Sequence, residues 1–154
     1  MARLDKIRAY TSRLIYRLMG RTRFASPSEV ERTEIAFYRS QLKPGQIAFD
    51  VGANVGAITL LMAELVGEEG QIHAFEPAYK TFETLQANCL ASKMSNVVLN
   101  RLALADKEGE VELYVYDDEH HSLNTLIKRP LENYGLDLKP LGIDRVQATT
   151  IDRY

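Results

Sequence analysis

The chain has 154 residues, of which 45% are hydrophobic and 26% charged, with a formal net charge of −2. This length allows one domain that buries roughly two thirds of its unfolded surface. The balanced charge argues against a nucleic-acid-binding protein. The single cysteine, Cys89, excludes an internal disulfide and favours a reducing cytoplasm.

The first 23 residues differ in charge from the rest of the chain. They contain seven basic residues and one acidic residue, a local charge of +6 that leaves −8 for the remainder. Apolar residues recur at helical spacing, so we expect a basic amphipathic helix over residues 1–25, ahead of a single domain over residues 26–154. The helix could pack on its own domain or on a partner chain, lie on an anionic membrane surface, or act as a targeting signal. Its apolar run is too interrupted for a secretory signal and too short to span a bilayer.

The domain opens with a predicted helix and a predicted strand. Ser26 is a suitable N-cap, followed by Pro27 at the first helical position, so a helix should run to about Leu42. After the turn Pro44-Gly45, the short apolar run 47–49 is typical of a strand buried in a parallel sheet. A second helix is expected from Val55 to about Val66, ended by a glycine.

Between that strand and helix lies the sequence D-V-G-A-N-V-G, residues 50–56. Gly52 and Gly56 allow a sharp turn and a close approach of the backbone to a ligand. Asn54 could cap the following helix or contact the ligand. A strand over residues 71–75 would bring Glu76 beside this turn, where its carboxylate could accept the hydroxyls of a ribose. The pattern therefore predicts a nucleotide-type cofactor site.

The details of the turn bear on which cofactor it binds. The middle glycine of the dinucleotide pattern G-x-G-x-x-G is missing, and Asp50 would repel a diphosphate. The same carboxylate could hold a cation such as the α-ammonium of an amino acid. S-adenosylmethionine carries both an ammonium group and a ribose.

The second half of the chain is predicted to add one helix and three strands. We expect the helix over Tyr79–Lys93 and the strands over Asn96–Leu102, Glu110–Tyr116 and Asp144–Thr150. The polar stretch 117–122 should be a loop that contains His120 and His121. Neighbouring side chains on an extended chain point in opposite directions, so no metal site is expected there. A general base that removes a proton from a substrate hydroxyl and a solvated loop without a catalytic role remain alternatives.

Several of these segments together resemble a known family. D-V-G-A-N-V-G, H-A-F-E-P and S-N-V-V-L-N-R-L-A-L-A-D-K-E-G-E-V-E-L-Y are similar to class I S-adenosylmethionine-dependent methyltransferases, and A-L-A-D-K-E-G-E-V-E-L with the later S-L-N-T-L to their FkbM type. The resemblance covers roughly residues 34 to 152. It implies a Rossmann-like α/β fold with a parallel sheet, and O-methylation of a hydroxyl on a sugar, glycolipid or other small metabolite. The alternating segments 110–116 and 144–150 would add a strand pair to this fold.

The resemblance also implies a set of cofactor-binding residues. Asp50 and Gly52 would lie near the methionine moiety, Glu76 at the ribose, and Leu102 with Ala103 beside the adenine. The full expected set is Asp50, Gly52, Ala53, Asn54, Gly56, Glu76, Pro77, Leu102 and Ala103. Many methyltransferases have an aspartate where this chain has Ala103, whose backbone N–H could still serve the adenine ring.

FkbM-type proteins normally continue beyond the I-D-R-Y at residues 151–154 with further strands and helices. The chain is therefore expected to form an incomplete, cofactor-binding portion of such a domain. One alternative is an inactive fragment, or a subunit that needs a partner chain or a second copy to complete its sheet. Another is an NAD-dependent oxidoreductase, which Asp50 and the absent middle glycine disfavour.

Overall fold

The computed structural model describes residues 27–117, 119–128, 131 and 138–154. The predicted basic helix over residues 1–25 lies outside these described residues, so both the helix and the domain boundary at residue 26 stay predictions. None of the described helices is both long and apolar enough to cross a membrane.

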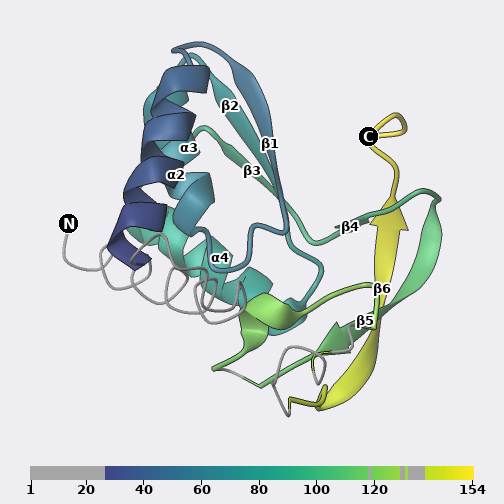
Figure 1. The fold of residues 1–154 in the computed structure, drawn as a ribbon. Helices are drawn as coiled ribbons and strands as arrows, with labels where there is room; N and C mark the ends of the chain where they lie inside the picture. The colour runs from purple at the N-terminus through teal and green to yellow at the C-terminus, as the bar shows by residue number, and fades with distance from the viewer. Residues whose placement is uncertain (1–26, 118, 129–130, 132–137) are drawn as a thin grey trace.

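The first sheet consists of three parallel strands in the order β1-β2-β3. Their bounds are Ile47–Val51, Gln71–Phe75 and Val97–Asn100. Helix α3, Ala57–Val66, joins β1 to β2, and helix α4, Tyr79–Ala91, joins β2 to β3. Because both connections step in the same direction across the sheet, both helices cover the same face, where α2, Pro27–Gln41, also lies (Figure 1). This arrangement confirms the predicted Rossmann-like parallel sheet.

The core lies between this sheet and its helices. On the central strand β2, Ile72, Ala74 and Phe75 are completely buried. Ile72 contacts buried side chains of α3, and Ala74 contacts Leu60 of α3 and Leu85 of α4. The ring of Phe75 lies on the other face of the sheet, beside Phe49 and Tyr154. This explains why the apolar residues of 71–75 predicted their strand well.

The opposite face of the first sheet is much less covered. On β1, Ile47, Phe49 and Val51 are 64%, 43% and 59% exposed. The ring of Tyr154 lies at this face, with its centroid 4.8 Å from that of Phe75 and 6.1 Å from that of Phe49. Among the described residues, no strand pairs with the outer edge of β1 or of β3.

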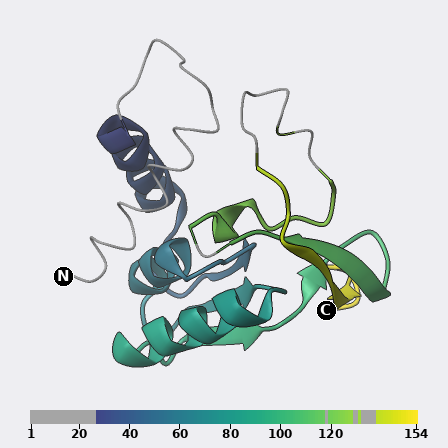
Figure 2. The same ribbon diagram turned by 90° about the horizontal axis from the view of Figure 1, so that it is seen from below.

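A second sheet lies beside the first, on the side away from the helices (Figures 1 and 2). Its strands are β4, Ala103–Leu104, β5, Gly109–Val115, and β6, Gly142–Thr149. Their order in the sheet is β4-β6-β5. The antiparallel pairing of β5 with β6 confirms the predicted additional strand pair. The prediction that the third strand continues to Leu102 is wrong, because β3 ends at Asn100 and the chain then joins the second sheet, where Ala103 pairs with Ala148.

Two local predictions also need correction. The helix expected from Val55 begins at Ala57, because Gly56 adopts a left-handed conformation, φ 90°, that cannot continue into a right-handed helix. The stretch expected to be a loop contains a short 3₁₀ helix, His121–Leu123.

Candidate cofactor site

The turn between β1 and α3 is held down by hydrogen bonds to β2 and to itself. The amides of Gly52 and Ala53 both donate to the Phe75 carbonyl at 2.9 Å, and the Gly56 amide donates to the Ala53 carbonyl. The amide of Asn54 donates to Glu76 Oε2. With Val55, whose amide donates to Asn54 Oδ1 at 2.7 Å, all five backbone amides of the turn are engaged within the protein.

This hydrogen bonding bears on the kind of cofactor that the turn itself can bind. A diphosphate-binding turn must present free backbone N–H groups to the phosphate oxygens. The turn from Gly52 to Gly56 has none left for that purpose. The geometry therefore gives no support to the NAD-dependent alternative.

The predicted cap role of Asn54 is wrong. Asn54 has φ 53°, and its side chain accepts from the next amide rather than from the first turn of α3. The N-cap of α3 is Gly56, with no side-chain hydrogen bond to the helix. The left-handed conformation that asparagine tolerates explains its presence in this tight turn.

Glu76 is the buried polar centre of the site. It is 6% exposed, and its Oε2 and Oε1 accept from the amides of Asn54 and Ala78, each at 2.9 Å. The Thr81 hydroxyl is a further hydrogen-bond partner of this carboxylate. A carboxylate has about four acceptor positions, so Glu76 fixes the turn and the start of α4 while keeping capacity for a ligand hydroxyl.

Asp50 is also buried in part, but it faces the helix. Its Oδ2 accepts from the Thr59 hydroxyl of α3 at 2.6 Å. Burial raises the pKa of Asp50 above its usual range, although the hydrogen bonds from Thr59 oppose this shift. Burial likewise raises the pKa of Glu76, with a smaller contribution from the nearby Asp50 charge.

Neither carboxyl group forms a salt bridge with any described residue. Two raised carboxyl pKa values without a basic partner mean that the site carries uncompensated negative charge when both groups ionise. A cationic ligand would stabilise that charge. In the described part of the chain, no cluster of three or more histidine, cysteine or acidic residues could hold a metal ion.

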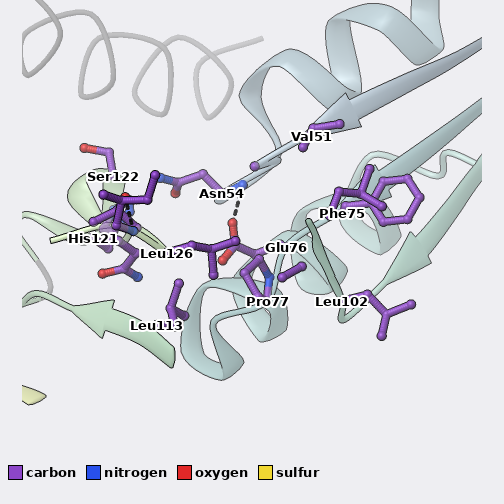
Figure 3. Close-up of a pocket in the computed structure, with 16 residues that line it drawn as sticks. Val51, Asn54, Phe75, Glu76, Pro77, Leu102, Leu113, His121, Ser122 and Leu126 are labelled. Carbon is purple, nitrogen blue, oxygen red and sulfur yellow. Dashed lines mark hydrogen bonds between the residues drawn. The ribbon is translucent and has the colours of Figure 1, made fainter. Parts of the chain in front are cut away.

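A cavity of about 310 Å³ opens beside Glu76 (Figure 3). Six residues of the predicted cofactor set line it: Gly52, Asn54, Glu76, Pro77, Leu102 and Ala103. Figure 3 shows His121 and Ser122 near Asn54 at one end, Phe75 and Leu102 at the other, and Glu76 between them. Gly52 has no atom within 4 Å of where a Cβ would stand, so the backbone is open there.

The other predicted residues do not line this cavity. Asp50 bonds to Thr59, Ala53 packs in the core, and Gly56 lies against Leu85. His120 is also absent from the lining, and its Nδ1 lies 2.6 Å from Asp117 Oδ1.

Residues far along the chain complete the cavity and were not predicted. They belong to the second sheet and to the segment between its strands β5 and β6: Leu104, Leu113, Ser122, Asn124, Thr125, Leu126 and Ile127. His121, a catalytic candidate from the sequence, lines the cavity as well. The S-L-N-T-L stretch over residues 122–126 was the available signal, because it belongs to the family resemblance and supplies four of these residues.

The residues present suit an adenosine bearing a cationic sulfur. Glu76 offers an acceptor for a ribose hydroxyl, and Leu102, Ala103 and Leu113 form an apolar wall suited to an adenine ring. The absence of free turn amides suits a ligand without phosphates. The two ionisable carboxyls, Asp50 and Glu76, suit its positive charge.

Comparison with known proteins leads to the same family. One curated relative, 31-O-demethyl-FK506 methyltransferase FkbM of Streptomyces tacrolimicus, is 37% identical over 78 residues, covering 51% of this chain and 29% of the relative. The chain therefore spans less than a third of that relative's length.

Two solved structures are similar in part. An O-methyltransferase from Thermotoga maritima has 21% identity and a TM-score of 0.44, covering 49% of this chain and 31% of that one. A methyltransferase from Aquifex aeolicus has 18% identity and a TM-score of 0.42, covering 61% and 55%. The family model of the methyltransferase FkbM domain matches residues 50–154. Since that match spans well over half of its length, the protein belongs to the FkbM methyltransferase family.

Proposed function

We propose that the protein is an S-adenosylmethionine-dependent methyltransferase. The observation that carries this proposal is the pairing of Glu76 with a turn whose amides are all engaged. That geometry supports a ribose without a diphosphate, and membership of the family supports a methyl donor. When bound, S-adenosylmethionine supplies an electrophilic methyl group on a positively charged sulfur.

Five of the predicted cofactor residues have a defined role in this proposal. Glu76 accepts a ribose hydroxyl, while Leu102 and Ala103 contact the adenine. Gly52 lets the methionine portion approach the backbone, and the Asp50 carboxylate contributes negative charge from behind the turn. The main task of the protein is then to hold donor and acceptor in reactive alignment, which can lower a barrier by roughly 7 to 11 kcal/mol.

The acceptor in this proposal is a hydroxyl of a sugar, glycolipid or other small metabolite. Support comes from the family and from the name of the Streptomyces tacrolimicus relative, which describes methylation of an oxygen on another molecule. Of the two histidine candidates, His121 is the better general base, because it lines the cavity and His120 does not. The lone Cys89 supports a cytoplasmic location. The basic, amphipathic pattern of residues 1–23 supports contact of this segment with a membrane surface as part of the proposal.

The test is calorimetric titration of the purified chain with S-adenosylhomocysteine, with NAD as the comparison ligand. Saturable binding of S-adenosylhomocysteine, weakened at least tenfold by Glu76→Gln, is the expected result. Glu64→Gln, the same chemical change at an exposed position of α3, is the matched control and should bind normally. Binding of NAD but not of S-adenosylhomocysteine by a folded chain would refute the proposal.

A second candidate function is that of a subunit that needs another chain for activity. The exposure of Ile47, Phe49 and Val51 on β1, together with the unpaired outer edge of that strand, favours it. It predicts that S-adenosylhomocysteine binds weakly to the isolated chain. Sedimentation across a concentration series separates the two readings, since self-association with tighter binding at high concentration would favour the second.

A further inference from the structure

The cofactor proposed for the cavity carries one negative group besides its positive ones. S-adenosylmethionine ends in an amino acid, and its α-carboxylate needs a cation or several hydrogen-bond donors once it leaves water. The described residues that line the cavity include no lysine or arginine. The amides of the turn after β1 are engaged within the protein. Other neutral donors are therefore left to bind the carboxylate.

The order of groups along the cavity indicates where this carboxylate lies. In the proposed function, Glu76 binds the ribose near the middle and Leu102 lies at the adenine, so the methionine portion extends in the opposite direction. Figure 3 shows Asn54, His121 and Ser122 together at that end of the cavity. We therefore searched these residues and their neighbours for donors.

Asn124 belongs to the same end of the cavity. It lines the cofactor cavity, and together with His121 it also lines a second cavity of about 510 Å³. The lining of the second cavity includes Val55, the residue that follows Asn54 in the turn. Lys80 lines the second cavity but not the first, so it adds no positive charge to the cofactor lining.

Both asparagines have an oxygen that is already bound and a nitrogen that is available. Asn54 Oδ1 accepts from the Val55 amide at 2.7 Å, and Asn124 Oδ1 accepts from the Tyr116 amide at 2.9 Å. These contacts fix the orientation of each side-chain amide, so each Nδ2 group is free to act as a donor. Among the described residues, nothing accepts from either Nδ2.

Ser122 adds an unsatisfied hydroxyl to this end of the cavity. Its Oγ is buried and has no hydrogen-bond partner among the described residues. A buried hydroxyl without a partner is unfavourable, and a ligand oxygen beside it would remove that penalty. A carboxylate has about four acceptor positions, enough for this hydroxyl and for both asparagine nitrogens.

We propose that Asn54 and Asn124 bind the α-carboxylate of the methyl donor, with the Ser122 hydroxyl as a third donor. The inference rests on the proposed methyltransferase function and adds the residues that recognise the amino-acid end of the cofactor. Neutral donors hold the carboxylate without cancelling the negative charge that Asp50 and Glu76 offer to the ammonium and the sulfonium. The segment between β5 and β6 then contributes to cofactor specificity and not only to enclosure.

The test compares two ligands that differ only in this carboxylate. S-adenosylhomocysteine has it, whereas 5′-deoxy-5′-(3-aminopropylthio)adenosine has the same adenosine, sulfur and ammonium without it. Calorimetric titration of the full chain with each ligand gives the ratio of the two affinities. A substitution that damages the cavity in general weakens both ligands and cancels in this ratio, so a changed ratio reports a contact with the carboxylate.

Asn124→Asp keeps an oxygen for the Tyr116 amide but replaces the donor with a negative charge. It should lower the preference for S-adenosylhomocysteine over the second ligand at least tenfold. Asn124→Ala removes the donor without adding charge and should lower the same preference at least threefold. Asn54→Asp makes the first change on the opposite wall, keeps an acceptor for the Val55 amide, and should act in the same way.

Gln86→Glu is the matched control. It converts an amide to a carboxylate at an exposed position of α4 outside both cavity linings, so the ratio should stay within twofold of that of the unsubstituted chain. If Asn124→Asp does not fold, Asn124→Ala and Asn54→Asp decide the outcome.

The outcomes separate this inference from the function on which it rests. Binding of both ligands with ratios unchanged by the asparagine substitutions overturns the carboxylate assignment alone. A lower ratio in the aspartate variants but not in Asn124→Ala also overturns it, because an added charge and not a lost donor then explains the change. A folded chain that binds neither ligand overturns the proposed function together with the inference.

Discussion

The substitution Gly56→Ala should destabilise the domain through two separate effects. Gly56 has φ 90°, where an L side chain is strained. An added Cβ would also stand 2.6 Å from Leu85 Cδ1, closer than real Cβ contacts. Leu85 is completely buried among Ala53, Leu60 and other core residues, so it cannot turn away without moving them.

The two effects have different expected sizes. The left-handed conformation costs about 1 to 2 kcal/mol for a residue with a Cβ, and overpacking of a filled core typically costs about 1 to 3 kcal/mol. Gly56→Ala should therefore lower the free energy of unfolding by roughly 2 to 5 kcal/mol. Gly52→Ala is the matched control: its φ is 79°, but nothing lies within 4 Å of the added Cβ, so only the first effect applies.

Urea unfolding followed by circular dichroism measures both variants. Leu85→Val removes the Cδ1 atom, so the double variant Gly56→Ala/Leu85→Val should lose about 1 to 3 kcal/mol less than the sum of the two single losses. Equal losses for Gly52→Ala and Gly56→Ala, or additive losses in the double variant, would show that the contact with Leu85 does not explain the glycine.

Three further predictions concern the buried polar groups. Glu76→Gln keeps the shape of the side chain but has one acceptor oxygen for two backbone amides, so the free energy of unfolding should fall by about 1.5 to 3 kcal/mol; an unchanged urea midpoint would contradict this. Burial, helped by the Asp50 charge, raises the pKa of Cys89 to about 11, so a disulfide reagent at about pH 8 should label the native thiol far more slowly than the unfolded one. Burial raises the pKa values of Asp50 and Glu76, so the folded state holds these protons more tightly than the unfolded state. The two groups should therefore lower the free energy of unfolding as the pH rises past their ordinary pKa values of 3.8 and 4.5. Asp50→Asn should flatten that decline in pH-dependent urea unfolding, and a steeper decline would count against it.

The sequence predicted the first sheet well because its signals are local. Apolar runs, glycine turns and helical spacing between Pro44 and Ala91 each act over a few residues, and the strands and helices fell within about two residues of expectation. The start of α3 was misplaced because the conformation of Gly56, and not apolar spacing, decides where the helix can begin. Asn54 resembles a cap in sequence, but its φ of 53° gives it a different role.

The candidate site was predicted only where it is built from those local elements. Gly52, Glu76 and Pro77 follow directly from strand ends, and the structure places them around one cavity. The segment 121–127 closes that cavity from a distant part of the chain, and no local pattern indicates where a loop will lie. Likewise, the pairing of Ala103 with Ala148 depends on tertiary contacts, so the early end of β3 could not be read from its apolar run.

The two sheets also differ in how much of the chain each needs before it can form. In the first sheet, Ile47 pairs with Gln71 and Ile72 with Val97, so all three strands can associate once residue 100 is available. In the second sheet, Ala103 must wait for Ala148, 45 residues later. Loop closure is costlier over the longer separation, so we expect the first sheet to assemble early, during synthesis, with the second sheet following. The cofactor cavity takes residues from the later part, so an early intermediate would hold Glu76 in place without enclosing the site. Ligand binding would therefore depend on the last step of folding.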